Sequence, residues 1–298
     1  MRNLLKRIIK LFCGNLLQRV RALEQEVRRT HDILDVMSDI SFARKATGAR
    51  RVIQLAEVKV LKEITDLLTA NEIQYSLCGG TLLGAVRHGG FIPWDDDVDM
   101  AVLRDDYEHA FELITEHFSV ERGYRVSRST CIRVILDGTP CQVDVFPFEV
   151  HRIPCDDAEG MKRFSETRDR MIERIQIDWE RLKTDGNVIV NMDRNQLGEL
   201  IAEFARQDEG ECKVLATGCE TANRHYPPLK YDWVFPLKKI RFEGFEFSAP
   251  ADPEVVVLNY FGEYMDFPKA IACHEDIKAR LSVDAFIKMR DFAKGVAS

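Results

Sequence analysis

A glycine pair followed by a dense group of aspartates constrains this chain more than any other feature. The stretch "GGTLLGAVRHGGFIPWDDDVDM" spans residues 79–100 and places aspartates at positions 95, 96, 97 and 99. Like charges at this density repel one another unless a cation lies among them or water surrounds them. The fold must therefore bring either solvent or a positive charge to this loop.

The segments on both sides of the stretch predict a mixed α/β unit. We expect a helix from about residue 50 to 68, a strand ending at the glycine pair, and a helix over 81–88 with Thr81 as its N-cap. The apolar run after the aspartates predicts a strand, and a helix follows at 106–118. Further β-rich segments lie at 124–128, 132–136 and 141–150. We therefore predict an α+β fold with a mixed sheet and flanking helices.

The alternation of residues after the loop predicts a metal site. In a strand, Asp97 and Asp99 project from one face while Val98 and Met100 point into the core. Carboxylates on Cα atoms roughly 6.6 Å apart can converge on one or two divalent cations. Hard oxygen ligands of this kind suit Mg²⁺ or Mn²⁺. The alternative is a solvated acidic turn.

A third aspartate and the glycine pair extend this site. Asp144 lies in the otherwise apolar segment "CQVDVFPF", where a buried carboxylate needs a partner. A metal shared with Asp97 and Asp99 would supply that partner; a hydrogen-bonded structural aspartate is the alternative. At Gly79 and Gly80, the succession of strand, turn and helix aims backbone N–H groups at an anion. An anion cradle beside a metal site is what phosphoryl transfer needs.

These motifs resemble a known family. The stretch at 79–100, "DVFPF" at 144–148 and "VFPLKKIRFEGFEFSAPADPEVVVLNYFGEYMDFP" near the end resemble the LicD family, which includes phosphocholine transferases and fukutin-type ribitol-phosphate transferases. The resemblance implies a nucleotidyltransferase-like fold. It also implies transfer of a substituted phosphate from a CDP-linked donor to a hydroxyl group of a glycan or its lipid-linked precursor, with release of CMP.

The motifs give an expected role to each site residue. The expected metal ligands and catalytic residues are Asp97, Asp99 and Asp144, with Asp144 as the proton acceptor. The expected donor-binding residues are Gly79, Gly80, Thr81 and Arg87. For Arg87, whose planar guanidinium suits a phosphate, the alternative is a surface arginine.

Two other functions fit parts of the same pattern. Asp97, Val98 and Asp99 also match the metal-binding Asp-x-Asp motif of glycosyltransferases. Such an enzyme would transfer a sugar and release a nucleoside diphosphate. The glycine pair before the acids argues against a glycosyltransferase. A non-catalytic, membrane-attached scaffold is the other alternative. A scaffold would not need three acids in otherwise apolar strands.

The N-terminal region predicts contacts outside the catalytic unit. Residues 1–16 combine an apolar helical stripe with basic residues, which suits the surface of an anionic membrane. From residue 16 to 37 the apolar positions alternate by four and three, which predicts a short coiled coil and hence a homo-oligomer. The alternative for both features is an amphipathic helix packed on its own domain.

Four regions follow from these patterns. They are an N-terminal helical extension (1–48), a nucleotidyltransferase-like catalytic core (49–150), a mostly helical region on the acceptor side (151–230) and a C-terminal LicD-type block that completes the catalytic domain (231–298). The net charge of −7 gives no basic face for nucleic acid, so we expect no such partner.

Cysteine usage predicts the compartment. The eight cysteines show no Cys-x-x-Cys spacing, and neither a cleavable signal pattern nor a long apolar run is present. We expect free thiols and a cytoplasmic protein, peripheral on the inner face of the membrane. A structural zinc on Cys131, Cys141 and Cys155 is a remaining alternative.

Overall fold

The computed structural model describes residue 16 and residues 19–30, 39–175, 194–205, 209–221, 226–268 and 281–296. The chain divides into two compact units. One unit comprises residues 44–263 and 272–298, and the other comprises residues 1–43 and 264–271. All predicted donor-binding and metal-binding residues belong to the first of these units.

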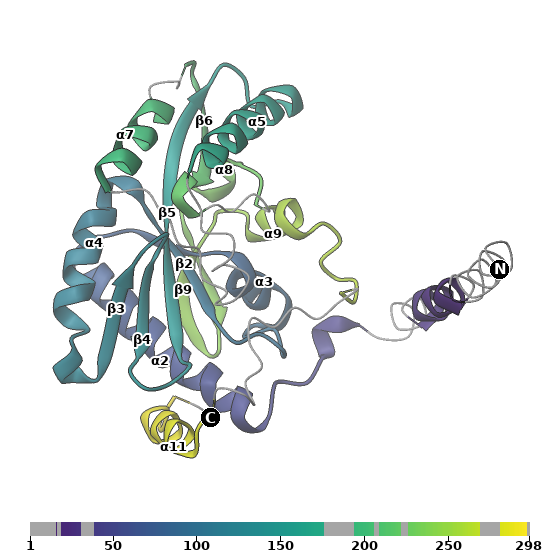
Figure 1. The fold of residues 1–298 in the computed structure, drawn as a ribbon, viewed down its shortest axis with the longest axis vertical. Helices are drawn as coiled ribbons and strands as arrows, with labels where there is room; N and C mark the ends of the chain where they lie inside the picture. Colours follow the sequence, from purple (N-terminus) through teal and green to yellow (C-terminus); the bar gives the residue numbers. More distant parts are fainter. Residues whose placement is uncertain are drawn as a thin grey trace, which may run out of the picture. The chain divides into compact units, whose positions relative to one another are not determined.

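A mixed seven-stranded sheet forms the centre of this unit (Figure 1). Its strands are β1 (Tyr75–Leu77), β2 (Val98–Leu103), β3 (Tyr124–Arg128), β4 (Ile132–Leu136), β5 (Gln142–Ile153), β6 (Cys212–Thr217) and β7 (Leu229–Lys230). The order is β1-β2-β5-β4-β3, with β6 joined to β5 and β7 to β6. Only β2 and β5 run parallel. The long strand β5 is central, because it pairs with β2 along one edge and with β4 and then β6 along the other.

Helices flank this sheet, which confirms the predicted fold class. The described helices are α2 (Gly48–Ala70), α3 (Gly79–His88), α4 (Arg104–His117), α5 (Ala158–Arg174), α7 (Arg194–Ala205), α8 (Tyr231–Val234), α9 (Pro253–Phe261) and α11 (Val283–Phe292). Helices α2 and α4 pack against β2 and β5, whereas α3 packs against β2 and α9. Val98 and Met100, which alternate with Asp99 in β2, are fully buried as predicted.

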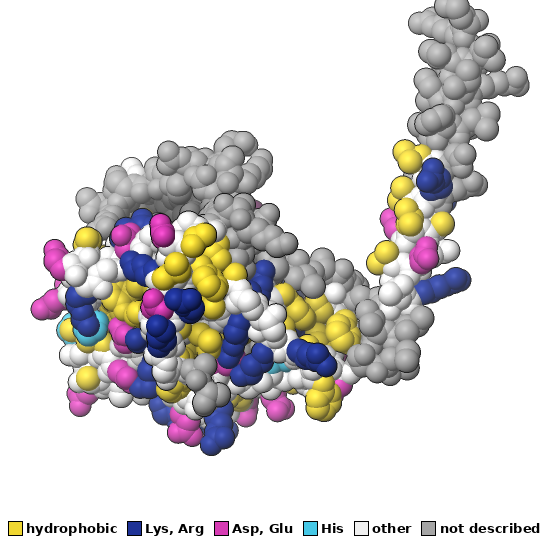
Figure 2. All heavy atoms as spheres, turned by 90° about the horizontal axis from the view of Figure 1, so that it is seen from below, with side chains coloured by type: hydrophobic (Ala, Val, Ile, Leu, Met, Phe, Trp, Pro, Cys, Tyr) yellow, Lys and Arg dark blue, Asp and Glu magenta, His cyan; other side chains and the backbone are white. Residues whose placement is uncertain are grey.

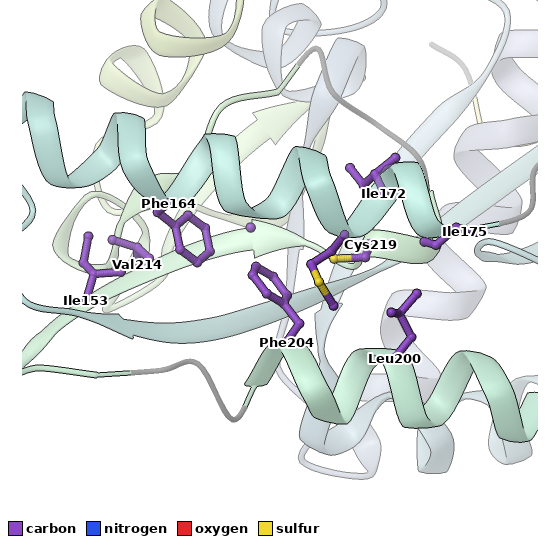
Figure 3. Close-up of a cluster of buried hydrophobic side chains, with 10 residues drawn as sticks. Ile153, Phe164, Ile172, Ile175, Leu200, Phe204, Val214 and Cys219 are labelled. Carbon is purple, nitrogen blue, oxygen red and sulfur yellow. The ribbon is translucent and has the colours of Figure 1, made fainter.

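A second apolar cluster joins α5 and α7 to the far end of β5 and to β6. Figure 3 shows Phe164 of α5 and Phe204 of α7 pointing toward each other, with Val214 of β6 and Ile153 of β5 beside them. The rings of Phe164 and Phe204 stack with their centroids 5.6 Å apart. These helices therefore rest on an extension of the same sheet that carries Asp144.

The structure adds a strand to the region from 151 to about 225. This segment reads as mostly helical, but it contains β6, which pairs with β5 over Phe148–Ile153. A strand of six residues between helical segments is too short for its period to stand out. The continuation of the predicted helix at 176–183 lies outside the described residues.

The start of α3 also differs from the prediction. The helix begins at Gly79 with Cys78 as its N-cap residue, so Thr81 lies in the first turn and does not cap it. The Thr81 hydroxyl instead accepts a hydrogen bond from the backbone N–H of Asp99 at 2.9 Å. Thr81 therefore fixes the start of β2 against α3.

Strands β8 (Lys238–Phe242) and β9 (Phe245–Ala249) form a separate hairpin. Its two-residue turn, Glu243-Gly244, has positive φ angles of 50° and 87°, as a type I′ turn requires. The Glu243 carboxylate accepts hydrogen bonds from Arg51 (3.0 and 2.7 Å), Lys45 (2.8 Å) and the backbone N–H of Phe91 (3.0 Å). Burial alone would raise the pKa of Glu243, but these hydrogen bonds lower it to about 2.

Replacing Glu243 with glutamine is expected to lower the free energy of unfolding at pH 7 by about 3 kcal/mol, because it removes the buried carboxylate that pairs with the partly buried Arg51 and the exposed Lys45. Since the pKa is depressed in the folded state, this stabilisation is complete above the ordinary glutamate pKa and disappears as the pH falls from about 4.5 toward 2. Urea unfolding of both proteins between pH 7 and pH 2.5 measures the difference. Glu246→Gln, at an exposed position of β9, is the matched control and should change little; equal effects of the two substitutions would contradict this account.

The N-terminal helix has its predicted apolar positions at the surface. Residue 16 and residues 19–30 are helical, and Figure 2 shows hydrophobic side chains uncovered along this helix. Residues 1–15 and 31–38 lie outside the described part of the chain, and so do the predicted membrane stripe and the end of the predicted coiled coil. Among the described helices, none combines the length and apolarity that crossing a membrane needs.

Candidate active site

Three charged residues form a row across neighbouring strands of the sheet. Asp99 of β2 is the direct partner of Asp144 on the parallel strand β5, and Asp144 is in turn the partner of Arg133 on the antiparallel strand β4. Residues in register on adjacent strands project from the same face. The fold thus brings Asp99 and Asp144 together as predicted, and adds an arginine that the motifs did not indicate.

Arg133 binds both oxygens of the Asp144 carboxylate. Its Nε lies 2.7 Å from Oδ1 and its Nη2 lies 2.6 Å from Oδ2. Burial lowers the pKa of the Arg133 guanidinium, but the interaction with Asp144 outweighs burial and raises the pKa above its usual value. This bidentate geometry is the strongest form of arginine–carboxylate pairing. In this state Asp144 already has a cationic partner.

Asp97 and Asp95 lie in the loop that precedes β2. Asp97 directly precedes the first strand residue, Val98, so of the predicted acid pair only Asp99 belongs to the strand. Burial, together with the charges of Asp97, Asp144 and Asp95, raises the pKa of Asp99 well above its usual value. Burial and Asp97 likewise raise the pKa of Asp95. The carboxylates of this loop therefore disfavour one another's ionisation.

Helix α2 holds this acidic loop in place. Arg50 donates a hydrogen bond to the carbonyl of Trp94 at 2.5 Å and forms an ion pair with Asp96 at 3.5 Å. The fully buried amide of Gln54 donates to the carbonyl of Asp95 at 3.0 Å. The loop conformation therefore depends on a helix that precedes the motif in the sequence.

A further carboxylate, Glu57, lies fully buried on the same helix. Neither of its oxygens has a hydrogen-bond partner among the described residues. Burial, reinforced by the charge of Asp97, raises its pKa well above the usual value. The helical periodicity of α2 could have identified Glu57 from the sequence, since Glu57 lies on the same core face of the helix as Ile53 and Ile64.

The glycine turn lies against the aspartates. Gly79 has a φ angle of +53°, and a Cβ atom there would lie 2.7 Å from Oδ2 of Asp99 and 3.3 Å from the Tyr226 hydroxyl oxygen. A Cβ on Gly80 would lie 3.0 Å from Oδ2 of Asp95. Only glycine fits at position 79, because both the backbone angle and the space exclude a side chain.

Of the remaining predicted donor-binding residues, Thr81 lies in the first turn of α3 and Arg87 lies in its last turn. Thr81 is occupied in holding β2, as described above. Arg87 is buried at the end of α3, where its Nε lies 3.0 Å from Nε2 of His88 and its guanidinium lies 6.0 Å from the centre of the Trp94 ring. Burial lowers the pKa of Arg87, and the charge of Asp95 opposes this shift. Arg87 is thus no free surface arginine.

Aromatic residues from the C-terminal part of the chain border the site. The rings of Tyr226 and Tyr260 stack with centroids 4.5 Å apart, and Phe261 meets Tyr226 edge-on at 5.8 Å. Burial, followed by the charge of Asp99, raises the pKa of Tyr226 well above its usual value. No local pattern around Tyr226 signals this position, because the contact spans more than a hundred residues of sequence.

The donor set fits a hard divalent cation without forming a closed cage. Within the described residues, no three His, Cys, Asp or Glu side chains lie close enough together to hold a metal ion. Mg²⁺ is usually held by one or two carboxylates, with water and substrate phosphates completing its shell. Asp97 and Asp99 suit that role. The raised pKa of Asp99 reflects burial and then repulsion by its neighbours, and a cation would relieve that repulsion. Asp144 can join them only if Arg133 releases it.

The absence of a metal-holding group among the described residues also bears on the structural zinc that the cysteines suggested. Cys131, Cys141 and Cys155 are free cysteines, and they do not gather into a metal-holding group in the described part of the chain. Cys131 and Cys141 are buried, whereas Cys155 is exposed.

A known protein family matches the part of the chain that contains the glycine turn and the charged row. Residues 72–169 match the family model of the LicD/FKTN/FKRP nucleotidyltransferase domain. This range includes the glycine turn and all residues of the charged row, but it excludes Glu57 and the aromatic residues from the C-terminal part of the chain.

Three curated relatives are similar over part of their length. An uncharacterized protein of Rickettsia prowazekii is 34% identical over 34% of this chain and 39% of its own length. The lipopolysaccharide cholinephosphotransferase LicD of Haemophilus influenzae is 44% identical over 23% of this chain and 27% of its own. The ribitol 5-phosphate transferase FKRP of Homo sapiens is 44% identical over 28% of this chain and 19% of its own length. The chain thus spans well under half the length of these relatives.

Among solved structures, terminal uridylyl transferase 4 from Trypanosoma brucei with bound UTP is similar at 14% sequence identity and a TM-score of 0.21, covering 43% of this chain and 49% of that one. The family match covers the glycine turn and the charged row. The chain therefore carries, at residues 72–169, a nucleotidyltransferase domain of the LicD family.

Proposed function

We propose that this chain transfers a substituted phosphate from a CDP-linked donor to a hydroxyl group of a glycan or its lipid-linked precursor, with release of CMP. The observation that carries the proposal is the position of Gly79 directly against Asp99, which stands in register with Asp144. A phosphate bound at the glycine turn would lie beside the carboxylates. The names of the relatives, a cholinephosphotransferase and a ribitol 5-phosphate transferase, support a transferase of this class.

The chain's own residues would bind and orient the donor. The first turn of α3 leaves backbone N–H groups at Gly79, Gly80 and Thr81 without partners in the helix, because its first helical hydrogen bond is that of Leu82. These groups and the positive end of the helix favour an anion. Arg87 adds positive charge at the other end of the same helix.

The carboxylates would supply the chemistry. The acceptor hydroxyl oxygen forms a bond to the donor phosphorus as the bond from phosphorus to the CMP oxygen breaks, and the hydroxyl proton passes to Asp144. A divalent cation, when bound, would neutralise charge on the transferred group and on the leaving oxygen. Asp97 and Asp99 would hold that cation. Asp99 is held by the buried strand β2, and Asp97 directly precedes that strand.

Nucleotide binding tests the donor class. Calorimetric titrations with CMP, CDP-choline and a UDP-sugar, each with and without Mg²⁺, should show the tightest binding for the cytidine nucleotides. That binding should weaken when Mg²⁺ is omitted, because phosphate and carboxylates then repel one another. Preference for the UDP-sugar would favour the glycosyltransferase reading. Absence of binding to every nucleotide would favour the scaffold.

We also propose that the chain works at the surface of an anionic membrane, at the inner face, held there by the basic and apolar residues of segment 1–15. Electrostatic attraction of this kind contributes on the order of 1 kcal/mol per basic residue and is screened by salt. The protein should therefore sediment with anionic vesicles at low salt and much less at high salt. Removal of residues 1–15 should abolish sedimentation; equal binding of the truncated protein would contradict the proposal.

A further inference from the structure

The helix that contains residues 19–30 carries a narrow apolar seam with no cover among the described residues. Leu16, Val20, Leu23 and Val27 are 61%, 43%, 60% and 64% exposed. Their spacing of four, three and four residues repeats every seven residues, as along one seam of a coiled coil. A seam of this width is typical of contact with a single partner helix.

The residue types on the seam select the number of helices. The spacing places Val20 and Val27 at a positions of the heptad and Leu16 and Leu23 at d positions. β-Branched residues at a with leucine at d favour two parallel strands. The remaining described positions of the helix are polar or charged, apart from Ala22, so no second apolar face is available for a larger bundle.

The charges beside the seam select a second copy of the same chain. Arg19 precedes Val20 and occupies a g position, and Glu24 follows Leu23 and occupies an e position. In a parallel, in-register pair, each g residue faces the e residue five positions further along the partner helix. Arg19 of each copy would therefore face Glu24 of the other, and two attractive pairs would form.

The same charges argue against a membrane as the occupant of this seam. A helix that lies on an anionic membrane carries basic residues beside its apolar face. Here the positions that border the seam hold Arg19, Glu24 and Glu26, so they carry more negative than positive charge, and an anionic membrane would repel the two glutamates. The basic and apolar segment 1–15 is thus distinct from the seam in its chemistry.

We propose that residues 16–30 form a parallel, two-stranded coiled coil with a second copy of this chain. The helix belongs to a different unit from Asp99 and Asp144, so pairing would not require the catalytic unit. The proposal is independent of the transferred group and of the donor.

Sedimentation of the full chain tests the seam and the charges. The wild type should show a monomer–dimer equilibrium between about 1 and 200 µM, as mass action requires, and Leu23→Asp should be monomeric throughout. Arg19→Glu should weaken dimerisation about tenfold by placing like charges opposite each other. The double variant Arg19→Glu/Glu24→Arg should restore it. A wild type that stays monomeric, or a dimer that survives Leu23→Asp, would overturn the proposal.

Cross-linking tests the parallel orientation. In a background with Cys13, Cys155 and Cys273 replaced by serine, Val20→Cys and Val27→Cys should each form a disulfide-linked dimer on oxidation, because equivalent seam residues meet in a parallel pair. Gln25→Cys, at the outer f position, is the matched control and should not. In an antiparallel pair, at most one point along the helix can meet its own counterpart. Cross-linking at only one of the two seam positions, or at neither, would overturn the parallel arrangement.

Discussion

Replacing Asp99 with asparagine is expected to reduce turnover about a thousandfold, as the loss of a group that stabilises transferred charge typically does. Asparagine keeps the shape of the side chain but is a poor ligand for a hard cation. The fold should survive, because burial and three neighbouring carboxylates already disfavour the ionised form of Asp99. At pH 8 the metal-free variant should be more stable than the wild type by on the order of 1 kcal/mol.

Mn²⁺ binding and urea unfolding complete this test. Asp99→Asn should bind Mn²⁺ more weakly, as measured by electron paramagnetic resonance of the free ion. Asp97→Asn and Asp144→Asn should likewise lose turnover. Asp105→Asn, at an exposed position in the first turn of α4, is the matched control and should behave as the wild type. Normal turnover of Asp99→Asn with unchanged Mn²⁺ affinity would contradict the assigned site.

Replacing Arg133 with methionine is expected to tighten Mn²⁺ binding about tenfold. In the wild type a cation must displace the guanidinium from both oxygens of Asp144, and a charge-assisted hydrogen bond contributes about 1.5–3 kcal/mol. Without Mn²⁺, the free energy of unfolding of the variant should be about 2 kcal/mol lower than that of the wild type, because Asp144 is left buried without its partner. Added Mn²⁺ should then stabilise the variant more than the wild type.

The sign of the change in affinity separates two roles of Arg133. If the arginine only orients Asp144 for the metal, its loss should weaken Mn²⁺ binding. Arg125→Met is the matched control, since Arg125 lies on β3 and pairs with Asp137 at the surface, away from Asp144. Mn²⁺ affinity that is equal to or weaker than that of the wild type would contradict competition between Arg133 and the cation.

Local patterns predicted much of the fold. Strands β3 and β4 occupy the predicted residues 124–128 and 132–136, and α2 and α4 lie within a few residues of their predicted bounds. Each of these elements has a clear period and is bounded by turn residues. The predicted capping role of Thr81 was wrong, because the helix begins two residues earlier, at two glycines that are poor helix formers. Strand β6 was not predicted, because the segments on both sides of it are helical.

The site was predictable only as far as its motifs extend. Asp99 and Asp144 could be named because each interrupts an apolar strand. Arg133 could not be placed, because strand register depends on pairing that a single segment does not reveal. Glu57 and Tyr226 come from elements before and after the motif, and only the tertiary structure brings them beside the aspartates.

Identification of the nucleotide released during turnover tests the central claim most directly. The full chain is incubated with Mg²⁺ and one donor at a time: CDP-linked choline, ethanolamine or ribitol, or a UDP-sugar. Water serves as the acceptor. The Asp99→Asn variant, treated in the same way, gives the background rate of nucleotide release. Separation of the products by chromatography should show CMP from at least one CDP-linked donor, and none above background from the variant. Release of a nucleoside diphosphate from the UDP-sugar, or no nucleotide release from any donor, would contradict the proposed transfer of a substituted phosphate.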